Sequence, residues 1–204
     1  MINALMTDRR SLMQHAMLLM GATALSGCDL LPGSSAPAEL GADQQRLLQS
    51  FADTLIPQTD SPGAVAAGVP ATFAAMYRDW ASDATRTDLS GALDRIDAAA
   101  RKAKGKGFAE LSASDRQAFL ANHDKAALVA VPPPADAPKG NPFVPIISVV
   151  DNGYAKLKDL VATLHYASEA ALTSDLAYDH VPGGWTASVP VTPETRPAIT
   201  FGAF

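Results

Sequence analysis

Apolar residues recur every three or four positions near the start of the chain's main body. The spacing predicts a helix from Asp43 to Ile56, since it gathers the apolar side chains on one face. That face consists of Leu47, Leu48, Phe51, Ala52, Leu55 and Ile56. Pro57 ends the helix because proline cannot continue the backbone hydrogen-bond ladder. Residues 57–68 are rich in proline and glycine, which predicts a structured loop.

Three further helices are predicted between residues 70 and 130. Proline suits a first helical turn, so a second helix begins near Pro70. Its shared face carries Phe73, Met76, Tyr77 and Trp80. A third helix is expected over 85–104, ended by Gly105, and its inward residues are Leu89, Leu93, Ile96 and Ala100. Ser112 with Asp115 resembles a capping box that opens a fourth helix holding Phe119 and Leu120.

The last third of the chain combines one long apolar stripe with proline-rich segments. Six prolines between residues 131 and 145 predict a stiff, irregular excursion. The stripe that follows predicts a helix over 146–172, and residues 173–204 show no helical period. The stripe comprises Val149, Val150, Tyr154, Leu157, Leu160, Val161, Leu164 and Ala167. We therefore expect an all-α fold, a small bundle of about five helices with Pro/Gly-rich loops and an extended C-terminal tail.

The N-terminal segment has the organisation of an export signal. Arg9 and Arg10 precede an apolar stretch at 16–25, which is too short to span a bilayer of ~30 Å. Arg9-Arg10-Ser-Leu resembles a twin-arginine signal, which exports folded proteins, although ordinary export signals also carry two arginines. The sequence Leu25-Ser-Gly-Cys28 resembles a lipobox, in which the cysteine accepts a diacylglycerol; cleavage nearby and release is the alternative. A short buried helix is a further alternative for the stretch.

These patterns divide the chain into four parts. Residues 1–27 are expected to be a twin-arginine-type lipoprotein signal, and residues 28–41 a flexible tether. Residues 42–185 form the helical domain, and residues 186–204 an extended C-terminal tail. Cys28 is the only cysteine, so an internal disulfide is excluded. With two acyl chains on Cys28, the protein would be lipid-anchored on the periplasmic side of the bacterial inner membrane.

Charge and motifs argue against several classes of function. The net charge is −5, and the basic residues are spread along the chain, so a nucleic-acid partner is not expected. The one basic run lies at a predicted helix C-terminus, where cations offset the helix dipole; it contains Arg101, Lys102, Lys104 and Lys106. The sequence has no Cys-x-x-Cys-His haem motif and no Gly-x-Gly-x-x-Gly cradle. We expect no catalytic, cofactor-binding or metal-binding residues.

Two histidines and two aspartates have neighbours that allow more than one interpretation. His165 and Glu169 are four residues apart, a spacing that suits a metal on one helix face; the alternative is a structural histidine. Asp179-His180 lies in a proline-bounded loop and fits either a catalytic pair or local hydrogen bonding. Asp94 and Asp97 are expected on the solvent face of the third helix.

Five parts of the chain together form a recognisable pattern. They are Phe51-Ala-Asp-Thr-Leu-Ile-Pro-Gln-Thr-Asp-Ser-Pro-Gly-Ala-Val-Ala-Ala-Gly-Val-Pro70, Trp80, Phe108-Ala-Glu-Leu-Ser112, Leu164-His-Tyr-Ala-Ser-Glu169 and Leu176-Ala-Tyr-Asp-His-Val-Pro-Gly183. This pattern resembles the gluconate 2-dehydrogenase subunit 3 family. The resemblance covers roughly residues 45–190. It implies a non-catalytic small subunit of a periplasmic, membrane-bound dehydrogenase of sugars, sugar acids or polyols. The large subunit would bind FAD, a multihaem cytochrome c subunit with haem c would accept electrons, and the small subunit would act as a chaperone in folding and twin-arginine export.

Within this interpretation, two segments are predicted partner contacts. The first contains Thr59, Asp60, Pro62 and Gly63, and the second contains Tyr178, Asp179, Pro182, Gly183 and Trp185. Aromatic residues such as those of the tail are favoured anchors at interfaces. The alternatives are that both segments are rigid loops and that the tail is a strap over the domain's own core. The alternative function is a stand-alone envelope lipoprotein that binds a protein partner or ligand.

Overall fold

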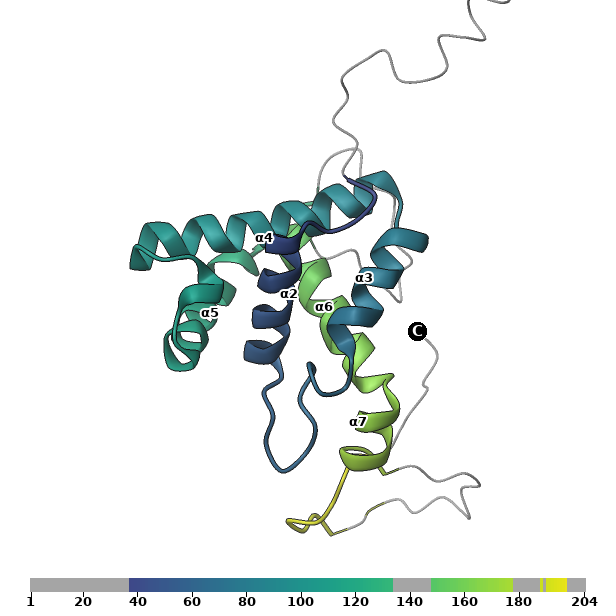
Figure 1. The fold of residues 1–204 in the computed structure, drawn as a ribbon. Helices are drawn as coiled ribbons and strands as arrows, with labels where there is room; N and C mark the ends of the chain where they lie inside the picture. The colour runs from purple at the N-terminus through teal and green to yellow at the C-terminus, as the bar shows by residue number, and fades with distance from the viewer. Residues whose placement is uncertain (1–36, 134–147, 178–187, 189, 198–204) are drawn as a thin grey trace, which may run out of the picture. The chain divides into compact units, whose positions relative to one another are not determined.

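The computed structural model describes residues 37–133, 148–177, 188 and 190–197, all within one compact unit. The described part is almost entirely helical (Figure 1), which confirms the all-α prediction. Its elements are α2 (Ala42–Leu55), α3 (Val69–Asp79), α4 (Asp83–Lys104), the 3₁₀ turn η1 (Phe108–Glu110), α5 (Ala113–Ala127), β1 (Ala130–Val131), β2 (Ser148–Val149), α6 (Asn152–Tyr166) and α7 (Glu169–Ser174). No helix among these is long and apolar enough to cross a membrane.

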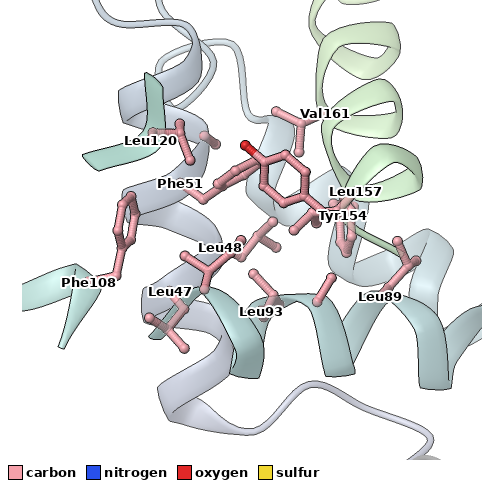
Figure 2. Packing of buried hydrophobic residues seen from close by; sticks show 14 of the residues in the cluster. Leu47, Leu48, Phe51, Leu89, Leu93, Phe108, Leu120, Tyr154, Leu157 and Val161 are labelled. Carbon is pink, nitrogen blue, oxygen red and sulfur yellow. The ribbon is translucent and has the colours of Figure 1, made fainter. Parts of the chain in front are cut away.

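The core lies where α2, α4 and α6 meet, with α3 and α5 packed at its sides. Figure 2 shows Phe51 of α2 against Tyr154 of α6, with Leu93 of α4 beneath them. The rings of Phe51 and Tyr154 meet edge to face, with centroids 6.0 Å apart and planes at 79°, a favourable aromatic geometry. Both side chains are fully buried, so this contact ties α2 to a helix about a hundred residues later in the sequence.

The predicted C-terminal end of the third helix and the predicted start of the fourth are confirmed, whereas the third helix begins at Asp83, two residues before its predicted start. Ser82 Oγ accepts a hydrogen bond from the backbone N–H of Thr85 at 3.2 Å, and so caps α4. Gly105 ends α4 in the left-handed conformation, at φ 71°, which a glycine adopts without steric cost. Ser112 Oγ caps α5 by accepting from the N–H of Asp115 at 3.2 Å.

The single helix predicted over 146–172 is wrong at both ends. Ser148 and Val149 form β2, which pairs antiparallel with β1, and α6 begins only at Asn152. Asp151 Oδ1 caps α6 by accepting from the N–H of Tyr154 at 2.9 Å. Towards the C-terminus, α6 ends at Tyr166, and Ser168 caps a separate helix, α7.

Two expectations about exposure are also corrected. Trp80 and Met76 were expected to share one face of the second helix with Phe73 and Tyr77, but both are exposed, whereas Phe73 and Tyr77 are buried. Asp97 was expected on the solvent face, but its carboxylate Oδ1 accepts from the backbone N–H of Phe108 at 2.8 Å. That bond fixes η1 against α4.

Other predictions lie outside the described residues. They concern the signal with Arg9 and Arg10, the lipid acceptor Cys28, and the contacts Tyr178, Asp179, Pro182, Gly183 and Trp185. The described tail residues, 188 and 190–197, are exposed. Ala177 donates its N–H to Pro197 O at 2.9 Å, so this part of the tail pairs beside the end of the helical body.

Candidate functional site

The loop between α2 and α3 is closed at its base by its own hydrogen bonds. The N–H of Ala64 donates to Ile56 O at 2.9 Å, and the N–H of Gly63 donates to Gln58 Oε1 at 3.0 Å. Thr59 N donates to Ser61 O at 3.1 Å across the tip. These bonds hold the loop in a fixed shape.

Gly63 is required for this shape by close backbone approach. A Cβ at this position would lie 2.6 Å from Gln58 N, 2.7 Å from Pro57 C and 2.8 Å from Ile56 O. These are rigid backbone atoms, so any larger residue would force the loop apart. Gly63 itself is buried, and its part in the site is to shape the loop.

The predicted contact residues of this loop differ in exposure. Thr59 and Asp60 are exposed at the tip, whereas Pro62 is half-buried. A partner could therefore reach Thr59 and Asp60 directly, on a loop whose base is fixed. Fixed loops bind with a small loss of conformational entropy.

The loop is joined to the corner between α6 and α7, which lies at the same end of the bundle (Figure 1). Asp175, which ends α7, interacts with the Ser61 side chain, and this interaction is the main reason that the pKa of Asp175 lies below its usual range. His165 adds to the effect, with its Nε2 3.4 Å from Asp175 Oδ2. Asp175 thus links two segments that are far apart in the sequence.

The structure does not bring His165 and Glu169 together on one helix. His165 is fully buried in the last turn of α6, whereas Glu169 is the first residue of α7. Within the described ranges, no group of three potential metal-ligating side chains is present. His165 is therefore placed as part of the α6–α7 corner, through its contact with Asp175.

A second polar cluster joins α5 to α6, and sequence reasoning did not find it. Tyr154 Oη donates to Asp124 Oδ1 at 2.5 Å, and Lys158 Nζ donates to Asp124 Oδ2 at 2.6 Å. Burial, followed by the bond to Asp124, raises the pKa of Tyr154. His123 stacks on Phe119, with ring centroids 5.7 Å apart, and burial lowers its pKa. The cluster holds two helices together, and burial favours the neutral form of His123.

We expect Asp175→Ala to lower the free energy of unfolding by about 1–2 kcal/mol at neutral pH, because His165 loses its acceptor and Ser61 loses its interaction with the carboxylate. The pKa of Asp175 is depressed in the folded state. Its contribution is therefore present above the unfolded pKa of about 4 and is lost as pH falls through the lower folded value. Urea unfolding of both proteins at neutral and acidic pH measures this difference.

The exposed Asp60 provides the control for this experiment. Asp60→Ala is expected to change stability by less than about 0.5 kcal/mol. Equal stability of Asp175→Ala and the wild-type protein at neutral pH, or a difference that grows on acidification, would contradict the link between the loop and the α6–α7 corner.

Comparison with known proteins gives one match. The family model described as Gluconate 2-dehydrogenase subunit 3 matches residues 42–183, which is most of the chain. The matched region contains every helix from α2 to α7 and the loop with Thr59 and Asp60. No curated protein and no solved structure matches the chain.

Proposed function

Because this chain belongs to the gluconate 2-dehydrogenase subunit 3 family, we propose that it is the non-catalytic small subunit of an FAD-dependent dehydrogenase complex. The family match over residues 42–183 is the observation that carries this proposal. The large subunit would bind FAD and oxidise a sugar, sugar acid or polyol. A cytochrome subunit with haem c would accept the electrons, and this chain would act by binding the large subunit.

The internal contacts of this chain support a role exercised through binding. Asp175 is engaged by Ser61 and His165, and Asp124 by Tyr154 and Lys158. These groups hold loops and helices in place. Together these contacts make the helical domain rigid, so that its exposed residues are held in place for a partner to bind.

The N-terminal sequence supports a role in export. A flavoprotein must acquire FAD in the cytoplasm and so must cross the membrane already folded. A twin-arginine signal at Arg9 and Arg10 of this chain would carry a folded partner across with it. Lipidation of Cys28 would then hold the complex on the periplasmic side of the inner membrane.

Deletion of this chain tests the proposal. The FAD-binding subunit is first identified by capture on the tagged wild-type chain. In cells that lack the chain, that flavoprotein is expected to stay in the cytoplasm, and its periplasmic dehydrogenase activity should be lost. Re-expression of the chain should restore both.

Normal export and activity of the flavoprotein without this chain would contradict the accessory role. Capture of no flavoprotein at all would instead favour a stand-alone envelope lipoprotein. Cell fractionation with FAD fluorescence distinguishes these outcomes, because the flavin reports the location of the folded large subunit directly.

A further inference from the structure

The chain turns a corner between α3 and α4 (Figure 1). Trp80 directly follows α3 at this corner, and 84% of its surface is exposed. Met76, one helical turn earlier, is 38% exposed. We call residues 76–83 the Trp80 corner. A tryptophan carries about 150–250 Å² of surface, so the corner presents a large apolar side chain to solvent.

The backbone of the Trp80 corner is held rigidly. Arg86 of α4 donates from Nε to Tyr77 O at 3.0 Å and from Nη2 to Arg78 O at 2.8 Å. The N–H groups of Trp80 and Ala81 both donate to Met76 O, at 3.0 and 3.1 Å. The loss of conformational entropy on binding is therefore small at this corner, as for a preorganised anchor.

The charged residues near the Trp80 corner have a slight acidic excess. Arg78 pairs with Asp79 at 2.7 Å, and Arg86 pairs with Asp83 at 3.2 Å. Glu39 lies near enough to add to the rise in the pKa of Arg78, which is due mainly to Asp79. With two cations and three carboxylates, the net charge of the rim is −1. This sign disfavours an anionic membrane surface and complements a basic protein rim.

We propose that Trp80 and Met76 are an anchor that inserts into an apolar pocket, rimmed by lysine or arginine, on the dehydrogenase large subunit. The proposal rests on the proposed function and specifies where the two subunits meet. Tryptophan is among the residues most enriched at the energetic centres of interfaces, and a rigid aromatic anchor in a partner pocket is the usual arrangement there. The acidic rim would orient the two subunits during association.

The test measures binding of full-length variants, in detergent, to the flavoprotein captured with the wild-type chain. Trp80→Ala is expected to weaken binding at least about 30-fold, as truncation of an interface anchor does. Trp80→Phe should retain part of the affinity. Val150→Ala removes an apolar side chain that is 61% exposed elsewhere, and it should bind like the wild-type protein.

Two further measurements distinguish a protein partner from a lipid surface. Glu39→Lys should weaken binding to the flavoprotein, since it places a cation opposite a basic rim. The full-length chain with Cys28→Ser is also mixed with phosphatidylglycerol vesicles, on which Trp80→Ala should have no effect. Loss of vesicle binding in Trp80→Ala, with flavoprotein binding intact, would overturn the proposal in favour of a lipid surface.

The controls also separate this proposal from the function on which it rests. Wild-type affinity of Trp80→Ala for the flavoprotein overturns the anchor alone and leaves the accessory role in place. If the wild-type chain itself does not bind any flavoprotein, the proposed function fails and the anchor fails with it.

Discussion

Replacement of Phe51 by alanine is expected to lower the free energy of unfolding by about 3–5 kcal/mol. Phe51 is fully buried between α2 and α6, and the substitution would remove its edge contact with Tyr154 and leave a cavity. A loss of this size is a large fraction of the about 5–15 kcal/mol that stabilises a typical domain. Urea unfolding followed by circular dichroism measures the change.

Trp80→Ala is the matched control, because it also truncates an aromatic residue. Trp80 is exposed, so we expect its loss to change stability by less than about 0.5 kcal/mol. If the two variants were equally stable, the placement of the core between α2, α4 and α6 would be contradicted. The control also establishes that Trp80→Ala is folded when its binding is measured.

Replacement of both Arg9 and Arg10 by lysine is expected to abolish export of the flavoprotein. Because the signal would be read from this chain, the flavoprotein should still fold, bind FAD and pair with the variant in the cytoplasm. Fractionation should then find a complex with flavin in the cytoplasm and little activity in the periplasm. This result would separate carriage across the membrane from assistance in folding.

Arg46→Lys serves as the control for this pair of substitutions. Arg46 is exposed on α2, within the helical domain and outside the predicted signal. The Arg46→Lys variant should therefore leave export of the flavoprotein unchanged. Periplasmic flavoprotein in normal amount with the double lysine variant would show that Arg9 and Arg10 do not direct export.

Helix ends that carry a local signal could be predicted from the sequence. The apolar spacing in α2 and α4 is regular, and Pro57, Gly105 and Ser112 each act within one or two turns of the helix that they limit. Caps and breakers of this kind act through neighbouring backbone groups. Their effects are therefore visible in a short stretch of sequence.

The division of the predicted 146–172 helix depends on contacts that the sequence pattern does not reveal. Val149 fits an apolar helical stripe equally well, but pairing with Ala130 places it in a strand. Ser168 breaks the helix by donating its hydroxyl to His165 O at 2.6 Å and by accepting from the N–H of Ala171. Serine competes with the helical ladder in this way.

The exposed position of Trp80 has a local cause. The apolar spacing placed Trp80 on the same helical face as Phe73 and Tyr77, but α3 ends at Asp79, and Trp80 has φ −125° and ψ −25°. Outside the helix its side chain no longer follows the 3.6-residue period.

The loop containing Thr59 and Asp60 was predicted as a structured loop from its prolines and glycines. Its attachment to Asp175 was not, since that contact spans more than a hundred residues.

In the proposed function, this chain works by binding a flavoprotein and holds no redox group itself. The most direct test is to isolate the tagged full-length chain from its own cells and record the visible spectrum and the chain composition. We predict a yellow complex with a larger second chain, which keeps all the flavin when the two chains are separated. Flavin, haem or a metal that remains with this chain, or a colourless chain isolated alone, would contradict the account.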